Sequence, residues 1–488
     1  MAAEIHRTAI ESSGDFQAHA QLRTQPPRVM GLADLVMFYV VTGISLRWIA
    51  TAASAGPSSI IIWIGAWLFF YVPLALSVVE LSCRYPQEGG LYIWSKRAFG
   101  DFSGFMSGWT YWTSNLSYFP SVLYFTASNV LFMGGNRGAH LSSAKLFYML
   151  FAIGVLVVIT AMNVIGLNKG KWLHNVGSFG MWIPVAILVV MGVYAWQMFG
   201  SATSFSPSHL VPSTNLKGVL FWAAITFAVC GSESASMMGD EIKDPRRTLP
   251  RALLVAGVIV TFCYIGGTVA ILLALPSSEV NDLQGIMQAI SKTASRLGWY
   301  NLIPISAALI ALSNVGAASG FLAAVGRIPF VAGIDRFLPD SFGKLHPRWG
   351  TPHVSLIAQT LVASLLVFLG QAGTSIKGAY DVLVSISIIG AFVPYLYLFA
   401  AMFRLQKEPA PPGIFRVPGG RSVARFVAGV GFTTTALTIV VSLLPSPDEA
   451  NKILALIKIV GLTGVTIGTG GLIYYLGNRK RKASSSKV

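Results

Sequence analysis

Long apolar segments are the feature of this sequence that most restricts its fold. Twelve stretches of about 20 mostly apolar residues follow one another along the chain, separated by short polar connections. A helix of that length crosses the hydrocarbon core of a bilayer, and only 11% of the residues are charged, against about 25% in soluble proteins. The sequence therefore predicts an all-α integral membrane protein. The predicted spans are 30–53, 58–82, 102–133, 146–166, 175–199, 218–239, 252–275, 302–332, 353–370, 379–403, 426–445 and 453–476.

The basic residues give the predicted orientation. When the chain is threaded through a bilayer at the twelve segments, about three quarters of its 35 lysines and arginines fall on one side. Basic residues gather on the cytoplasmic side of membrane proteins, so we expect both termini in the cytoplasm and the spans in the cell (inner) membrane. A net charge of +16 would suggest nucleic acid in a soluble protein, but here it follows the topology and we expect no nucleic-acid partner.

Two of the predicted spans are interrupted near mid-depth by glycine and hydroxyl residues. The first span contains VTGIS, Val41 to Ser45, and the sixth contains CGSES, Cys230 to Ser234. A broken helix leaves backbone N–H and C=O groups unpaired, which hydrocarbon tolerates only where the break lines a polar cavity. Breaks at matching positions five spans apart favour a transporter site between inverted repeats. The alternative is that glycine is simply common in membrane helices.

Acidic residues inside the predicted spans are few. Glu233 lies beside the second break, and an ionisable group at mid-membrane indicates proton coupling or gating, the alternative being a structural tie between helices. Desolvation favours the neutral form of such a carboxyl, whereas hydrogen bonds to the broken backbone favour its charged form. The sequence does not decide which effect is larger. Asp34 and Glu80 lie at the ends of spans, where we expect interfacial structural roles.

An aromatic group marks the third span. Trp109 and Trp112 are three residues apart and therefore share a helix face, with Tyr111 and Tyr118 nearby. These rings could wall a substrate channel or bind a cation, and the alternative is packing against lipid or other helices.

Motifs for enzymatic chemistry are not seen in the sequence. The seven histidines lack metal-ligand spacing, and there is no G-x-S-x-G motif or phosphate-binding loop. We therefore expect neither an enzyme nor a metal or other cofactor, and energy from an ion or counter-substrate gradient. The three cysteines, Cys83, Cys230 and Cys263, lie in or beside spans and are interpreted as small buried hydrophobes.

Together these motifs resemble those of a known family. VTGIS resembles the G-S-G-I/V break of the amino acid–polyamine–organocation superfamily, with Val41 in place of its first glycine. CGSESASMMGDEIKDPRRTLPRA resembles the sixth span and following loop of that superfamily, and YPQEGGLYIW and VPYLY also fit. The resemblance covers nearly the whole chain and implies a LeuT-type fold of five-plus-five inverted repeats with two further helices. Within the superfamily, ISLR, FRVPGGRSVARFVAGVG and VSLLPSPDE look most like the glutamate/GABA antiporter branch.

The resemblance also implies an organisation of the chain. An N-terminal cytoplasmic tail precedes the two repeats, and a cytoplasmic loop, the last two spans and a short basic tail follow them. The corresponding residues are 1–28 for the tail, 29–199 and 216–403 for the repeats, 404–425 for the loop, 426–477 for spans eleven and twelve, and 478–488 for the basic tail.

A substrate site is implied where the two breaks meet. Phe227 and Phe321 match aromatic gate positions, and phenylalanine there leaves no indole N–H for a guanidinium or amine, which disfavours an arginine-like substrate. Asn115 and Ser387 match polar positions of the third and tenth spans. The substrate-binding residues implied in this way are Thr42, Gly43, Ile44, Ser45, Asn115, Phe227, Cys230, Gly231, Ser232, Phe321 and Ser387.

Two further charged pairs are candidate gates. Arg47 lies four residues after Gly43, and in LeuT-type transporters an arginine so placed pairs with an aspartate of the tenth span, here Asp381. The alternatives are that Arg47 snorkels to the headgroups while Asp381 caps its helix, or that Arg47 attracts an anionic substrate.

On the inner side, Glu241 with Arg246 could close a gate, whereas Asp244 before Pro245 could simply cap the next helix.

The sequence thus predicts a secondary active transporter that moves amino acids by alternating access. The branch resemblance favours acidic or γ-amino acids, with polyamines or neutral amino acids as the alternative substrates. A membrane channel or receptor is the competing class of function. The expected partners are a small-molecule amino acid or amine and the lipid bilayer, and the sequence leaves open whether the chain is a monomer or a homodimer.

Overall fold

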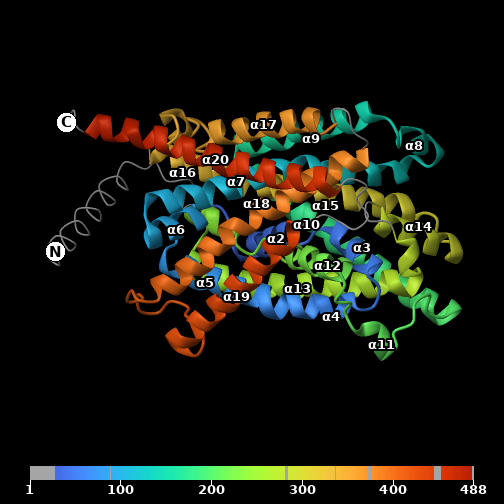
Figure 1. Ribbon diagram of the computed structural model, residues 1–488. Helices are drawn as coiled ribbons and strands as arrows, with labels where there is room; N and C mark the ends of the chain where they lie inside the picture. Colours follow the sequence, from blue (N-terminus) through green and yellow to red (C-terminus); the bar gives the residue numbers. More distant parts are fainter. Residues whose placement is uncertain are drawn as a thin grey trace.

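The computed structural model describes residues 28–87, 89–280, 284–335, 337–371, 376–444 and 452–485. This described part of the chain is helical and contains no β-strand, only an isolated bridge between Met30 and Ile242. Long helices run alongside one another in a single bundle, with α2 and α12 in its middle and α9 and α17 along one edge (Figure 1). The predicted all-α fold is confirmed.

The first half of the chain folds into α2 to α10. The elements are α2 Leu32–Gly43, α3 Leu46–Ser54, α4 Ser59–Ala66, η1 Trp67–Tyr71, α5 Val72–Arg84, α6 Leu91–Phe99, α7 Asp101–Val130, η2 Leu131–Gly134, α8 Asn136–Leu141, α9 Lys145–Ile165 and α10 Leu167–Phe199. A π-helical turn, η1, joins α4 and α5 into one span, Ser59–Arg84.

The second half folds into α11 to α20. The elements are α11 Pro207–Leu210, α12 Leu216–Ala228, η3 Ser234–Glu241, α13 Pro245–Ala274, η4 Ser277–Glu279, α14 Gly285–Leu297, α15 Leu302–Val325, α16 Arg327–Ile334, η5 Asp340–Gly343, α17 His353–Gln371, α18 Ile376–Leu405, α19 Gly420–Ser442 and α20 Lys452–Ser485. Because α20 continues to Ser485, the predicted basic tail is helical as far as the structure describes it.

All twelve predicted spans coincide with helices. Within the described residues, seven helices are long and apolar enough to cross a membrane, and the bent pair α2 and α3 makes an eighth. The other four spans correspond to α7, α12 with η3, α17 and α20. The apolar parts of α12 and α17 are short, whereas α7 is 30 residues long but rich in serine and threonine. Most side chains of α7 are buried between other helices and need not be apolar. That all twelve segments cross the bilayer stays a prediction.

The outer helices expose large apolar side chains, as contact with hydrocarbon requires. Leu254 and Val258 on α13 are 73% and 68% exposed, and Leu146 and Leu361 are similarly exposed on α9 and α17. Such a surface would be unfavourable in water and is stable in lipid. The described chain is therefore a multi-pass membrane protein.

The two interrupted helices lie in the centre of the bundle. The helix α2 ends at Gly43, Ile44 and Ser45 are extended, and α3 begins at Leu46 after a bend of 40°. The helix α12 ends at Ala228, and the 3₁₀-helix η3 resumes at Ser234. Around these breaks, α2 packs against α10, α13, α15 and η3, while α3 packs against α12, α13 and α14. Both breaks predicted from the sequence are confirmed.

Candidate functional site

The two helix breaks meet each other directly. Gly231 has φ +111°, a conformation that glycine adopts without strain. A Cβ at this position would lie 2.9 Å from the carbonyl oxygen of Thr42 and 3.2 Å from the Cα of Gly43. A Cβ at Gly43, in contrast, would meet only a methyl group of Val260 at 3.6 Å. The close approach of the two breaks therefore depends on Gly231 rather than on Gly43.

Tyr264 on α13 holds both breaks from one side. Its hydroxyl oxygen accepts a hydrogen bond from the backbone N–H of Ser45 at 3.0 Å. The same oxygen lies 2.8 Å from the carbonyl oxygen of Ala228 and 3.2 Å from that of Gly43. One phenol thus serves backbone groups that lost their helical partners at both breaks, which stabilises the interruption inside the membrane.

A small cavity of ≈ 60 Å³ lies between the breaks. It is walled by α2, α3, α7, α12, α13, α15 and α18 and by the break before η3. Its lining residues are Thr42, Gly43, Ser45, Arg47, Trp48, Tyr111, Ser114, Asn115, Tyr118, Phe227, Ala228, Cys230, Gly231, Glu233, Tyr264, Phe321, Ser387, Ala391 and Tyr395. We call this space the central cavity.

Most of the predicted substrate-binding residues line the central cavity. Those that do are Thr42, Gly43, Ser45, Asn115, Phe227, Cys230, Gly231, Phe321 and Ser387. Ile44 and Ser232 do not line it, although both are buried like the residues that do, at 1% and 3% exposed. At the first break, Ile44 and Ser45 are extended, and successive side chains of extended backbone point to opposite sides, so these neighbours need not share one role.

Glu233 lines the central cavity and is 1% exposed. Its Oε1 accepts hydrogen bonds from the hydroxyls of Tyr111 at 2.6 Å and Tyr395 at 2.8 Å. Its Oε2 accepts from the backbone N–H of Gly231 at 3.1 Å. The carboxylate thus ties α7 and α18 to the second break, so a change in its charge would act on three elements at once.

Aromatic rings and one cation form another part of the cavity wall. The guanidinium of Arg47 lies 4.5 Å from the ring centroid of Trp48 and 5.9 Å from that of Tyr118. Trp48 packs edge-on against Phe227 at 5.6 Å, and Tyr118 against Phe321 at 5.0 Å. The two predicted gate phenylalanines therefore belong to one aromatic layer beside Arg47.

For the predicted outer gate, the structure tests the alternative for Arg47 but not its pairing with Asp381. Arg47 is only 1% exposed, so the alternative in which it snorkels to the headgroups is wrong. Its Nη1 donates to the hydroxyl of Ser121 at 3.4 Å. Asp381 belongs to α18, but its side chain lies outside the described residues, and the pair with Arg47 stays a prediction.

The aromatic group of the third span divides into two roles. Tyr111 and Tyr118 line the central cavity, as the channel interpretation expected. Trp109 and Trp112 face away from it, and Trp109 donates to the carbonyl oxygen of Thr466 on α20 at 2.9 Å. For the two tryptophans the packing alternative holds.

Several lining residues were not predicted as site residues. Tyr395 belongs to VPYLY in α18, one of the motifs that carry the family resemblance, so this motif could have indicated it. Trp48 follows Arg47 by one residue, and Ser114 precedes Asn115. Tyr264 stands alone in an apolar span, and no local pattern distinguishes it from an ordinary buried tyrosine.

Ser387, which the sequence did predict, contacts α7 through its hydroxyl, 2.9 Å from that of Ser117.

Glu241 forms a buried ion pair, but its partner is not Arg246. Its Oε1 lies 2.8 Å from Nε and 2.5 Å from Nη2 of Arg327, and both side chains are buried. Its carbonyl oxygen accepts from the backbone N–H groups of Val29 and Met30. Arg246 instead lies exposed in the first turn of α13. The pair Glu241–Arg327 joins the end of η3 to the start of α16, and the segment before α2 is attached to it.

The two acidic residues predicted at the ends of spans, Asp34 and Glu80, have structural partners. Asp34 accepts from Gly31 N–H and from the side chain of Asn175, and Glu80 is held by four donors at the end of α5. Asp244 occupies the N-cap position before Pro245, but its side chain makes no capping hydrogen bond and its φ is +44°. The capping interpretation is therefore wrong in its mechanism, although α13 does begin at Pro245.

The described residues contain no group of three or more histidine, cysteine, aspartate or glutamate side chains placed to hold a metal ion. The cysteines are free, and Cys83 and Cys263 are buried, while Cys230 lines the central cavity. Nothing in the central cavity resembles a nucleophile activated by a base, and its polar groups suit recognition of a small polar molecule.

Comparison with known proteins agrees with this geometry. The family model described as "Amino acid permease" matches residues 30–465. A serine/threonine exchanger of Bacillus subtilis is 26% identical over 91% of this chain and 94% of its own length. A probable agmatine/putrescine antiporter of Lactococcus lactis is 23% identical over 81% of this chain and 84% of its own. An uncharacterized transporter of Legionella pneumophila is 27% identical over 86% of this chain and 90% of its own.

These matches confirm the resemblance to the amino acid–polyamine–organocation superfamily, while the resemblance to its glutamate/GABA branch stays a prediction. The match to the family model covers both helix breaks and the residues that wall the central cavity. The chain belongs to the amino acid permease family and is a secondary transporter of amino acids rather than an enzyme.

Proposed function

We propose that the chain exchanges acidic or γ-amino acids across the membrane by alternating access. The observation that carries this proposal is the pair of opposite charges in the wall of the central cavity. Arg47 and Glu233 both line it, and both are buried. A zwitterion presents one charge of each sign, whereas a polyamine would place only cations beside the buried guanidinium.

The broken helices supply the remaining contacts of the proposed substrate. The first turn of α3 begins at Leu46 beside the cavity, and its N-terminus offers partial positive charge to an α-carboxylate. The carbonyl ends of α2 and α12 offer acceptors to an α-amino group. A second carboxylate, as in an acidic side chain, would then face Arg47.

The energy source is proposed to be an ion or counter-substrate gradient, with no cofactor. The proposed orientation places both termini in the cytoplasm and the spans in the cell membrane, because the connections on that side carry most of the lysines and arginines.

Counterflow in proteoliposomes tests the proposal. Vesicles loaded with unlabelled glutamate, γ-aminobutyrate, serine or putrescine are offered the same labelled compound outside. We expect uptake with glutamate or γ-aminobutyrate to be accelerated by internal substrate and to fall strongly in Arg47→Gln. Exchange of serine alone or of putrescine alone would refute the proposed substrate class. Uptake that internal substrate does not accelerate would instead indicate a channel or receptor.

A further inference from the structure

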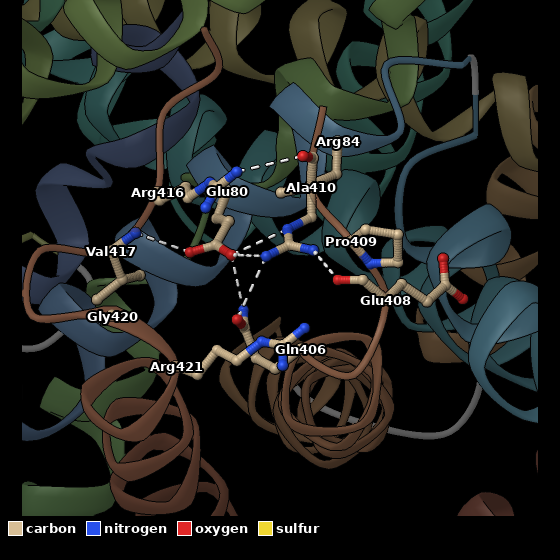
Figure 2. Close-up of a pocket in the computed structure, with 10 residues that line it drawn as sticks. All are labelled: Glu80, Arg84, Gln406, Glu408, Pro409, Ala410, Arg416, Val417, Gly420 and Arg421. Atoms are coloured by element: carbon tan, nitrogen blue, oxygen red, sulfur yellow. Dashed lines mark hydrogen bonds and ion pairs between the residues drawn. The ribbon is translucent and has the colours of Figure 1, made fainter. Parts of the chain in front are cut away.

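A second and larger cavity lies at the end of α5, against the loop that joins α18 to α19. Its volume is ≈ 290 Å³, and it shares no residue with the central cavity. It is lined by Glu80, Arg84, Gln406, Glu408, Pro409, Ala410, Arg416, Val417, Gly420 and Arg421 (Figure 2). We call it the loop cavity.

One carboxylate in the wall of the loop cavity is fully engaged. Oε1 of Glu80 accepts from Nε and Nη2 of Arg84, at 2.9 and 2.6 Å, and from Nε2 of Gln406 at 2.7 Å. Its Oε2 accepts from the backbone N–H of Val417 at 2.7 Å. Glu80 is 1% exposed, so this cluster forms a rigid floor in which the charges of Glu80 and Arg84 cancel.

The second carboxylate of the lining, Glu408, points away from the cavity (Figure 2). Its Oε2 accepts from Nε and Nη2 of Arg97, at 3.1 and 2.9 Å, and from the hydroxyl of Tyr85 at 2.7 Å. Burial and this hydrogen bond raise the pKa of Tyr85 to about 12, so the phenol keeps its proton and remains a donor. Only the backbone of Glu408 faces Arg84, whose Nη1 donates to the Glu408 carbonyl oxygen at 3.2 Å.

Two further arginines of the lining, Arg416 and Arg421, are exposed at the surface of the protein. Nη2 of Arg416 donates to the carbonyl oxygen of Ala410 at 3.2 Å, and Nη2 of Arg421 to that of Lys407 at 3.3 Å. Among the described residues neither guanidinium has a carboxylate partner. Their side chains lie on two sides of the Glu80 cluster (Figure 2). Because each guanidinium has five N–H donors, most of them remain available to a ligand in the cavity.

The position of the cavity explains how a ligand could reach it. Gly420, the first residue of α19, lines the cavity, so the positive end of this helix faces the same space as the two arginines. Val423 and Phe426 follow within two turns and are 40% and 72% exposed, as lipid-facing side chains are. The loop cavity therefore opens where the hydrocarbon surface of the bundle ends.

We propose that the loop cavity is a binding site for a phosphate-bearing anion, held by Arg416 and Arg421. Guanidinium groups bind phosphate oxygens through two parallel hydrogen bonds, and the excess charge of the cavity favours an anion. The ligand would fasten the loop between α18 and α19 to the end of α5. A phospholipid headgroup and a soluble phosphate offer this same chemistry, and the experiment distinguishes them.

The test uses the purified full-length protein in a zwitterionic detergent. The melting temperature is followed while inorganic phosphate is titrated in one arm and short-chain phosphatidylglycerol in the other, at constant ionic strength set by chloride. Short-chain phosphatidylcholine is the control lipid. We expect a saturable rise in melting temperature with phosphatidylglycerol. A response to inorganic phosphate as well would show that the phosphate group alone suffices, and no response to either would overturn the proposal.

Variants link the response to the two arginines. In Arg416→Gln/Arg421→Gln we expect the apparent affinity to fall by at least about tenfold, since each charge-assisted hydrogen bond lost weakens binding by about this factor. The matched control, Lys344→Gln/Arg348→Gln, removes the same charge from two exposed residues on the loop before α17 and should stay within about twofold of the wild type.

Equal losses in both double variants would mean non-specific attraction to basic residues and would overturn the site. If the Arg416/Arg421 double variant does not elute as a folded protein, the single variants decide instead. Each should weaken binding on its own, and wild-type affinity in both would refute the proposal.

Discussion

The hydroxyl oxygens of Thr42 and Ser234 lie 3.1 Å apart, although 192 residues separate them in the chain. The Thr42 hydroxyl also donates to the carbonyl oxygen of Phe38 at 2.8 Å, and the Ser234 hydroxyl to that of Gly231 at 2.6 Å. Each hydroxyl thus satisfies its own broken helix and touches the other one. The two breaks are therefore in direct contact through these side chains as well as at Gly231.

The first prediction concerns the contact between the breaks. Gly231→Ala should weaken substrate binding by at least about tenfold, because the new Cβ would lie 2.9 Å from the Thr42 carbonyl oxygen at a positive φ that alone costs on the order of 1–3 kcal/mol. Gly43→Ala is the matched control, since its Cβ finds ordinary contact distance, and it should bind nearly as the wild type does. Binding of labelled substrate to purified protein measures both.

The Gly231 variant needs a check of folding, for which elution volume and melting temperature serve. A folded Gly231→Ala protein with wild-type affinity would show that the breaks do not form the substrate site. Equal losses in both glycine variants would mean that flexibility, rather than close approach, is what the site needs from glycine.

The second prediction concerns Glu233. Its carboxylate accepts from Tyr111, Tyr395 and Gly231 N–H, so all three neighbours are donors. Glu233→Gln cannot titrate. It keeps one acceptor oxygen and replaces the other by an NH₂ group, which can only donate. We expect the pH dependence of transport in proteoliposomes to flatten, with a lower rate at every pH. Tyr395→Phe removes one donor and leaves the carboxyl titratable, so its transport should still vary with pH. A wild-type pH profile in Glu233→Gln would make this glutamate a purely structural tie.

How far the sequence predicts this site depends on whether the signal is local. Glycine and hydroxyl residues in an apolar run are visible within a few residues, so the breaks at Gly43 and Gly231 could be found. The partner of Glu241 could not be found in this way. Arg246 is five residues away and looked suitable, but Arg327, 86 residues away, is brought to Glu241 by the packing of η3 against α16.

Other parts of the site show the same limit. Tyr264 serves three backbone groups at the two breaks, and only the position of α13 beside them gives it that role. Within the break itself, the motif identified Ile44 as readily as Ser45. The alternation of the extended backbone decides which of the two side chains lines the cavity. Neither residue type indicates that alternation.

The third prediction concerns the Glu241–Arg327 ion pair. Glu241→Gln leaves the buried Arg327 guanidinium without its carboxylate and should destabilise the protein by about 3–5 kcal/mol. The double variant Glu241→Gln/Arg327→Met removes both charges and should recover much of that loss. Thermal unfolding in detergent measures the series. Arg246→Gln serves as the control and should melt as the wild type does, because Arg246 is exposed. Additive losses in the double variant would show that the two residues do not act as a pair.

The fourth prediction concerns Arg47 and Asp381 as an outer gate. Arg47 is buried over Trp48 and Tyr118, and a cation at this depth is stable only with favourable electrostatic surroundings. A carboxylate from the first turns of α18 would supply them when the gate closes. A double-mutant cycle of Arg47→Ala and Asp381→Ala, read out as counterflow rate, should give a coupling energy of at least about 1 kcal/mol. The control cycle pairs Arg47→Ala with Asp340→Ala, an exposed acid on η5, and should be additive. Independent effects of the Arg47 and Asp381 changes would refute the gate and leave Arg47 with its proposed substrate contact alone.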